Sequence, residues 1–211
     1  MPRHARIDAP GAVHHLIVRG IMRSAIFYDG VDRERFIDRA AMVFADRTGI
    51  TPPAGTMRRL LTGYAVSFNK RHKRSGHLFQ NRYKSILCEE EPYLLELVRY
   101  IHLNPLRAQV VEDLHSLDSY TYSGHSAIMG RRERPWQDSE YVLKQFSDKT
   151  DTARTLYRAF VEAGIAEGQR RDLTGGGLIC SSKGWRPPQE TPAIGRVTNA
   201  FLAAAILSLR L

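Results

Sequence analysis

Cysteine is scarce in this chain of 211 residues. Cys88 and Cys180 are its two cysteines, and they lie far apart in the sequence. Two isolated cysteines give neither a disulfide framework nor a C-x-x-C metal site. We therefore expect a reducing location, the cytoplasm.

Long apolar runs are also missing. The longest one extends from Ala200 to Leu209 and is interrupted by Ser208, whereas a helix that crosses a bilayer needs about 20 apolar residues. The N-terminus, Met1 to Arg6, lacks the apolar core of a signal peptide. These features predict a soluble protein that is not secreted and has no membrane partner.

Acidic residues are absent from one long stretch of a basic chain. The sequence has 31 Lys and Arg against 22 Asp and Glu, which gives a net charge of +9 and a pI near 9.8. From Arg47 to Cys88 it contains nine basic side chains and no acidic one. A helix that is merely soluble usually mixes both signs, so this stretch favours a polyanionic partner. The nine basic residues are Arg47, Arg58, Arg59, Lys70, Arg71, Lys73, Arg74, Arg82 and Lys84.

Aromatic residues interleave with these charges at Tyr64, Phe68, Phe79 and Tyr83. Arg and Lys hold phosphates while unpaired bases stack on rings, a combination that suits single strands or hairpins. A charge run can also be a plain solvated face, and some of these rings must belong to the core.

The apolar spacing predicts the main elements. We expect a strand over residues 12–19 and an extended segment over 77–87. Helices are expected over 32–47, with Asp32 as N-cap, over 56–72, and from residue 90 or 91 to Asn104-Pro105, where the proline disfavours helical geometry. Shorter helices are expected over 138–146 and 151–162. The predicted inner faces comprise Phe36, Ile37, Ala40, Ala41 and Phe44; Met57, Leu60, Leu61, Tyr64, Ala65 and Phe68; and Leu94, Leu97, Val98 and Ile101.

Tyr100 is the candidate nucleophile. A tyrosine can attack a phosphodiester and form a phosphotyrosine, with a divalent metal polarising the phosphate. Asn104 lies one turn further on the same helical face, where its amide oxygen could complete the metal's coordination shell. Arg99 and His102 flank the tyrosine and are candidates for phosphate contacts. The residues alone leave a second interpretation open, in which Tyr100 is half-buried at the core margin and Asn104 is a helix C-cap.

Several motifs together resemble one family. They are RRLLTGY at 58–64, GHLFQNRYK at 76–84 and YIHLNPLR at 100–107, accompanied by HHLIVRG at 14–20 and GGGLI at 175–179. This combination, which spans most of the chain, resembles the REP-associated tyrosine transposases, bacterial members of the single-tyrosine HUH transposase family.

The resemblance implies an α+β fold, with a ferredoxin-like antiparallel sheet, packed helices and a helical C-terminal region. It also implies DNA transposition by single-strand cleavage and joining, with Tyr100 as nucleophile and Asn104 helping to bind Mg²⁺ or Mn²⁺. The expected partner is single-stranded or hairpin DNA from palindromic repeats, bound by a monomer or homodimer. The DNA contacts expected from the motifs and the basic stretch are Arg58, Arg59, Lys70, Arg71, Lys73, Arg74, His77, Gln80, Asn81, Arg82, Lys84, Arg99 and His102.

The chain departs from the family at its metal motif. None of its eight histidines are spaced as H-x-H, and His14 and His15 are adjacent, so on a strand they face opposite sides. Where the central strands belong, only residues 49–56 are found, too few for two strands of about five residues and a turn. We interpret this as an internal deletion that removed the metal ligands, so that DNA binding remains while the metal is not bound productively and cleavage is severely reduced.

The chain departs from the family a second time near its end. The resemblance ends after Trp185. We therefore expect a transposase-like domain over residues 1–125, a helical extension over 126–185 and a divergent tail over 186–211. Two other functions stay open: a non-catalytic module that binds DNA or RNA hairpins, and a decayed product without function.

Overall fold

The computed structural model describes residues 13–45, 53–81, 83–88 and 90–167. Within them helices predominate. The four longest are α1 (Gly30–Ala45), α2 (Pro53–Arg71), α3 (Glu90–His102) and α8 (Thr150–Ala163). Four shorter helices follow α3 along the chain: α4 (Asn104–Arg107), α5 (Leu114–Ser119), α6 (Gly124–Ile128) and α7 (Ser139–Lys144). Two 3-10 turns complete the set, η1 (Ile21–Arg23) and η2 (Gly164–Glu167).

Two strands form a small antiparallel ribbon. β1 (Val13–Ile17) pairs with β2 (Lys84–Cys88), so that Val13 lies opposite Cys88 and Ile17 opposite Lys84. The expected ferredoxin-like sheet is therefore wrong: the described residues form an α-rich fold with a single two-stranded ribbon. Because α1 ends at Ala45 and α2 begins at Pro53, the interval between them is too short for central strands and their turn.

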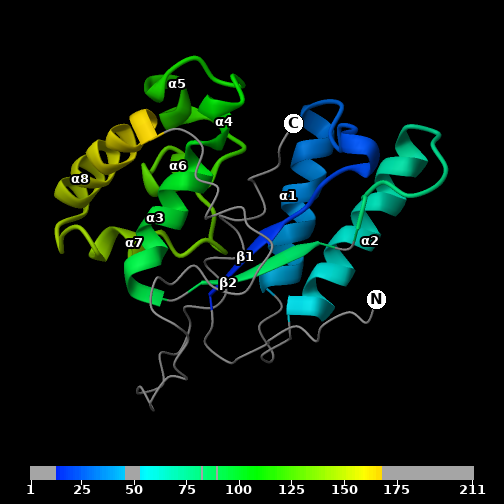
Figure 1. The fold of residues 1–211 in the computed structure, drawn as a ribbon, viewed down its shortest axis with the longest axis horizontal. Coiled ribbons are helices and arrows are strands. Elements are labelled where there is room, and N and C mark those ends of the chain that lie inside the picture. Colours follow the sequence, from blue (N-terminus) through cyan, green and yellow to red (C-terminus); the bar gives the residue numbers. More distant parts are fainter. Residues whose placement is uncertain (1–12, 46–52, 82, 89, 168–211) are drawn as a thin grey trace, which may run out of the picture.

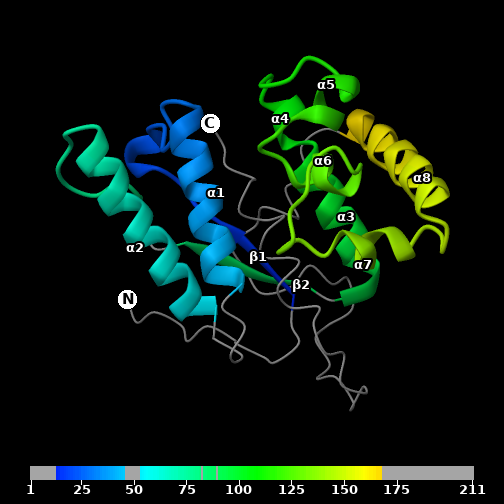
Figure 2. The ribbon, with the colours of Figure 1, turned by 180° about the vertical axis from the view of Figure 1, so that it is seen from behind.

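The helices form two groups around the ribbon. Figures 1 and 2 show α1 and α2 side by side on one side of it, and α3 to α8 gathered on the other. The groups touch where the Arg33 guanidinium lies 5.3 Å from the centre of the Tyr122 ring. The ribbon contacts the second group where the rings of His15 on β1 and Tyr100 on α3 lie edge to face, with their centres 6.4 Å apart.

The predicted inner faces are confirmed wherever the side chains are described. Phe36, Ile37 and Ala40 of α1 are buried, and Ala41 packs against the core. The side chain of Phe44 lies outside the described residues. The faces of α2 and α3 are buried as expected, with Ala65 partly so: Met57, Leu60, Leu61, Tyr64 and Phe68, and Leu94, Leu97, Val98 and Ile101. Apolar periodicity located these helices because burying one stripe stabilises each of them.

Helix ends differ more from expectation. α1 begins at Gly30, and its cap is Asp29, whose Oδ1 accepts the Asp32 N–H at 3.0 Å. α3 ends at His102 and Asn104 opens α4, because Pro105 fits a first helical turn but not a helix interior. The helices expected over 138–146 and 151–162 are α7 and α8. The domain boundary expected after residue 125 falls within α6.

None of the helices in the described part of the chain combines the length and the apolar character that a membrane span needs.

Candidate nucleic-acid interface

A groove of about 920 Å³ runs along α2. The chain turns at the end of α2 and comes back beside it toward β2 (Figure 1), and residues 76–81 and Tyr83 of this returning segment form the second wall. We call this the α2 groove. Its lining is mixed: Met57, Leu61, Ala65, Val66, Leu78, Phe79 and Tyr83 contribute apolar surface, and Arg58, Thr62, Asn69, His77, Gln80 and Asn81 contribute polar groups.

The returning segment is fixed by backbone pairing. Leu78 O accepts the N–H of Ile21 and Arg19 O accepts that of Gln80, both at 3.0 Å. The side chain of Asn69 donates to Gly76 O at 2.9 Å. Gly76 has φ +86°, a conformation that glycine adopts without strain. The groove is thus held on both sides by hydrogen-bonded structure.

Four of the predicted DNA contacts come together in this groove: Arg58 from α2, and His77, Gln80 and Asn81 from the returning segment. All four side chains are exposed. Motif residues more than 15 positions apart therefore share one concave surface.

More predicted contacts lie on α2, in the turn after it and on β2. Arg59, Lys70 and Lys73 are exposed on α2 and the turn after it, while Arg74 is half-buried with its guanidinium 5.7 Å from the centre of the Phe68 ring. Lys84 is half-buried on β2. The side chains of Arg47 and Arg82 lie outside the described residues.

The aromatic residues divide between core and groove. Tyr64 and Phe68 are 1% exposed and pack inside, and the Tyr64 hydroxyl donates to Ile26 O at 2.5 Å. Burial raises the pKa of Tyr64. Phe79 and Tyr83 line the groove. Tyr83 is 8% exposed and Phe79 is half-buried, so of the two rings only Phe79 presents surface on which a base could stack.

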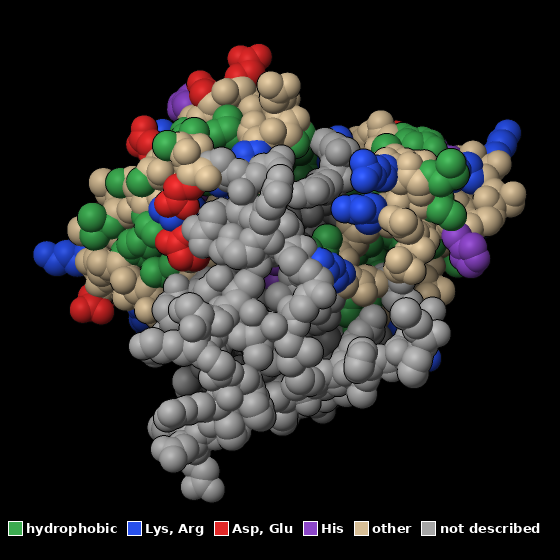
Figure 3. All heavy atoms as spheres, viewed as in Figure 1, with side chains coloured by type: hydrophobic (Ala, Val, Ile, Leu, Met, Phe, Trp, Pro, Cys, Tyr) green, Lys and Arg blue, Asp and Glu red, His purple; other side chains and the backbone are tan. Residues whose placement is uncertain are grey.

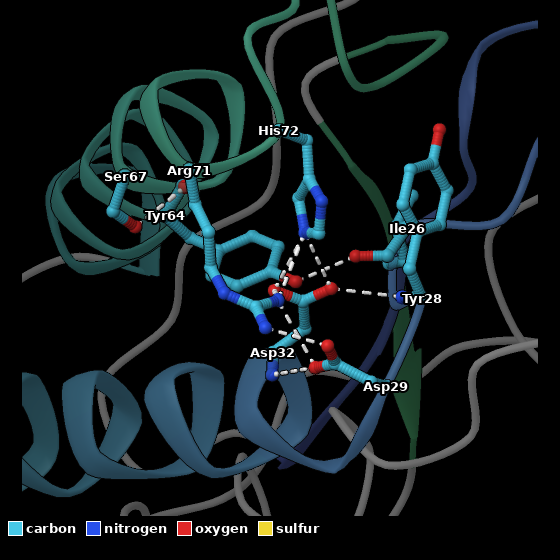
Figure 4. Close-up of polar contacts among 8 residues, drawn as sticks. All are labelled: Ile26, Tyr28, Asp29, Asp32, Tyr64, Ser67, Arg71 and His72. Carbon is cyan, nitrogen blue, oxygen red and sulfur yellow. Dashed lines mark hydrogen bonds and ion pairs between the residues drawn. The ribbon is translucent and has the colours of Figure 1, made fainter.

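Arg71 has a different role from the DNA contact expected of it. It joins α2 to the start of α1 by pairing with Asp32 at 2.6 Å and with Asp29 at 2.6 Å (Figure 4). The side chain of Asp32 is 1% exposed, and it also accepts the Tyr28 N–H at 2.8 Å and faces His72 at 2.9 Å. The basic stretch itself gives no sign of these acidic partners of Arg71, because they lie about 40 positions away in the sequence.

These contacts set the acidity of the two carboxyl groups. The hydrogen bond from Arg71 lowers the pKa of Asp29 to about 2. Burial opposes ionisation of Asp32, but hydrogen bonds from the Tyr28 N–H, His72 and Arg71 outweigh it, and its pKa is lowered. The hydrogen bonds that Arg71 donates to the carboxylates of Asp29 and Asp32 raise the pKa of Arg71, although its own desolvation opposes the shift. The cluster is an ion-pair clamp between the two helices.

Tyr100 lies in the core margin of the other helix group. It is 6% exposed, with His15 at the edge of its ring and the Arg107 guanidinium 5.2 Å from the ring centre. Arg107 also donates to Tyr100 O at 3.2 Å. Tyr100 is thus more buried than either interpretation assumed, and Asn104 begins α4 instead of capping α3.

The surroundings of Tyr100 do not fit a divalent metal. Mg²⁺ and Mn²⁺ prefer oxygen ligands, whereas a guanidinium lies over this ring. In the part of the chain that the structure describes, no group of three His, Cys, Asp or Glu side chains is placed to hold a metal ion.

Arg99 and His102 have structural contacts in place of the expected phosphate contacts. Arg99 is 7% exposed and pairs with Glu96 and Glu167, and its guanidinium lies 4.4 Å from the centre of the Phe160 ring. His102 is 1% exposed and its Nδ1 faces the Tyr157 hydroxyl at 2.6 Å. Neither side chain faces the α2 groove.

Two groove residues were missed from the sequence, Thr62 and Asn69. Together with Arg58 and Ala65 they follow one another at steps of four, three and four residues, which places them on one helical face. This stripe adjoins the apolar face of α2 and shares Ala65 with it, and its polar members are the signal in the sequence that could have identified the groove wall.

Charge is unevenly distributed over the surface. On the face shown in Figure 3, the described side chains visible over α1 and α2 include Lys and Arg, whereas Asp and Glu gather over the group from α5 to α8.

Comparisons of the chain with models of protein families, with curated proteins and with solved structures find no match.

Proposed function

We propose that this protein binds single-stranded or hairpin DNA in the α2 groove, and that it is a transposase-family protein whose cleavage activity is lost. The observation that carries the proposal is the groove itself. It collects exposed Arg58, His77, Gln80 and Asn81 with the rings of Phe79 and Tyr83 on one concave surface.

The chemistry of the groove supports an extended nucleic acid as its ligand. Arg58, Lys70 and Lys73 form no ion pair with any described residue, so their charges are available to phosphates. Side-chain amides donate and accept hydrogen bonds at base edges, and rings stack on unpaired bases. In a DNA duplex the faces of the bases are stacked on one another and only their edges are accessible. Unpaired loops or tails, whose base faces are open, therefore suit the α2 groove better.

The proposed loss of cleavage rests on Tyr100. A nucleophile has to reach the scissile phosphate, but this side chain is 6% exposed and lies under Arg107. The test is incubation of the protein with a labelled hairpin and Mn²⁺, followed by denaturing electrophoresis. We expect no covalent adduct; an adduct that disappears in Tyr100→Phe would show that cleavage is retained.

Binding is tested by changing the charge inside the groove. Val66 is 63% exposed in the groove wall, so Val66→Glu places a carboxylate beside the bound phosphates with little effect on the core. Like charges across an interface cost several kcal/mol, and we expect affinity for a fluorescent hairpin to fall by more than about tenfold.

The matched control is Met42→Glu. Met42 is 73% exposed on α1 and does not line the groove, yet its replacement changes the net charge by the same amount. Anisotropy titrations should give Met42→Glu an affinity within about threefold of the wild type. Equal losses in both variants would place the binding surface elsewhere. An RNA hairpin of the same sequence distinguishes a DNA-specific protein from a general hairpin binder.

A further inference from the structure

Four buried polar side chains outside the α2 groove form a continuous hydrogen-bonded chain. His102 of α3 faces the Tyr157 hydroxyl of α8 at 2.6 Å, and His125 of α6 faces the same hydroxyl at 3.0 Å. Nε2 of His125 faces Asp118 of α5 at 2.8 Å. Tyr157 and His125 are 0% exposed, and His102 is 1% exposed. This series of hydrogen bonds therefore links the four helices α3, α5, α6 and α8 inside the molecule.

The direction of each hydrogen bond follows from the carboxylate. Asp118 accepts from Arg158 Nε with one oxygen, at 2.8 Å, and faces His125 Nε2 with the other, so this nitrogen carries a proton. In a neutral His125 the other nitrogen, Nδ1, can only accept, and Tyr157 donates to it. Since Tyr157 has one proton, its oxygen accepts from Nδ1–H of His102. That leaves Nε2 of His102 with a lone pair.

The surroundings of this nitrogen are polar but incompletely paired. Among the described residues His102 Nε2 has no hydrogen-bond partner. A Cβ on Gly124 would lie 2.7 Å from it and 3.2 Å from both amide atoms of Gln137. Gln137 donates to Gly124 O at 2.9 Å, while its Oε1 has no partner in the described part of the chain. A bare basic nitrogen and an unused acceptor thus lie beside the same glycine.

We propose that these four side chains form a proton relay, which takes up one proton at His102 and stores it on His125 beside Asp118. The proton binds Nε2 of His102, and Nδ1 of His102 passes its own proton to the Tyr157 oxygen. The O–H proton of Tyr157 then passes to Nδ1 of His125. Only N–H and O–H bonds change, His102 ends neutral in its other tautomer, and Tyr157 ends neutral.

The position of the stored charge is what makes the relay favourable. The imidazolium forms at His125, 2.8 Å from the Asp118 carboxylate, instead of at His102, where no described carboxylate is in contact. Burial lowers the pKa of His102 well below its usual value, and His125 adds to this effect. Burial also lowers the pKa of His125, but Asp118 opposes that shift. Both rings are therefore neutral near pH 7.

A second proton disrupts the hydrogen bonds that link these four side chains. With His102 and His125 both charged, each Nδ1–H points at the Tyr157 oxygen, and the Tyr157 O–H has no acceptor left. The other charged groups here are Arg158, which pairs with Asp118 at 2.8 Å, and Glu162, 3.8 Å from Arg158. They are on α8 itself, and neither accepts from Tyr157. Acid thus acts in two steps, a change of tautomer and then release of α8 from α3 and α6.

The test is a pH titration of the full chain carrying ¹⁵N-labelled histidine, followed by long-range ¹H–¹⁵N NMR, which identifies each tautomer. At high pH we expect His102 as the Nδ1–H tautomer and His125 as the Nε2–H tautomer. As His125 becomes charged, His102 should change to Nε2–H at the same midpoint. Exposed His115 on α5 is the internal control, and its signals should change independently of those of His102 and His125. A His102 ring that is Nε2–H at high pH, or that keeps its tautomer while His125 titrates, overturns the relay.

Two variants separate a relay from two independent buried rings. Asp118→Asn removes the carboxylate that stabilises the stored charge, so the shared midpoint should fall by about 1–3 pH units. Tyr157→Phe interrupts the chain, so the tautomer of His102 should no longer follow His125. If the phenylalanine variant does not fold, Asp118→Asn and the wild-type titration still decide: an unchanged midpoint in Asp118→Asn contradicts the proposal.

Discussion

At the scale of single residues, Asp32 joins α1 to α2, the helix that lines the proposed interface. It accepts from the Tyr28 N–H at 2.8 Å and contacts Arg71 and His72 at 2.6 and 2.9 Å, with a side chain that is 1% exposed. Replacing it with asparagine removes the charge but keeps the shape. Hydrogen bonds to charged groups contribute about 1.5–3 kcal/mol each to stability, and we expect Asp32→Asn to lower the free energy of unfolding by about that amount. Urea unfolding measures the change; Asp38→Asn, at an exposed site on α1, is the control and should be nearly neutral.

The same cluster makes stability depend on acid. The pKa of Asp32 is lowered and that of Asp29 falls to about 2, so the folded state binds protons less readily than the unfolded one. This contribution is complete above about pH 4, near the unfolded value, and is lost as the pH falls through the folded values. Urea unfolding between pH 6 and pH 3 should show a shallower acid loss in Asp32→Asn than in the wild type. Parallel curves would contradict the assignment.

What could be predicted for individual residues depended on where their partners lie. Arg58 and Gln80, two of the expected DNA contacts, are exposed in the groove, because neighbours in the sequence largely determine exposure on a helix or a turn. Arg71 and His102 do not, because their partners Asp32 and Tyr157 lie 39 and 55 positions away. A basic or polar residue has the same character in the sequence whether it faces solvent or a buried carboxylate.

At the scale of elements, the packing of α6 against α3 depends on a glycine. A Cβ on Gly124 would lie 2.7 Å from Nε2 of buried His102, a ring with no free space to move into. Overpacking of this kind costs about 1–3 kcal/mol, which is the loss we expect for Gly124→Ala in thermal and urea unfolding. The matched control is Gly63→Ala on α2, where the nearest atoms belong to the end of the flexible Arg39 side chain. Its gain in helix propensity should offset that small rearrangement. A neutral Gly124→Ala would show that α6 does not pack this closely.

Helices were predictable because their apolar stripes repeat locally, and the buried faces of α2 and α3 followed directly from that repeat. The sheet was not predictable in this way. Pairing of β1 with β2 joins residues about 70 positions apart, and the family resemblance suggested strands that the interval between Ala45 and Pro53 cannot hold. The Asp29 cap was missed because the helix was expected to begin after Asp32, whereas α1 begins at Gly30 and Asp29 accepts the Asp32 N–H.

At the scale of the whole molecule, the charge excess lies in one stretch of the sequence. The nine basic residues between Arg47 and Cys88 equal the net charge of +9, and the rest of the chain carries 22 basic and 22 acidic residues. Of the nine, Arg58 lines the α2 groove, and Lys70 and Lys73 are exposed at the end of α2 and in the turn after it. Unpaired charges of one sign attract a polyanion. Binding should therefore depend on salt through a small, identifiable set of side chains.

Lys70 and Lys73, exposed at the end of α2 and in the turn after it, provide the test of that set. For a single strand, each neutralised phosphate contributes about 0.7 to the slope of log K against log salt. Replacing both lysines with alanine should lower the slope by about 1.4 if each contacts one phosphate. Arg131→Ala combined with Lys149→Ala removes two exposed charges from the other helix group and should leave the slope unchanged, even though the net charge falls equally. If both double variants reduced the slope alike, attraction to the net charge would explain binding; a loss confined to the lysine pair would locate the phosphates beside the α2 groove.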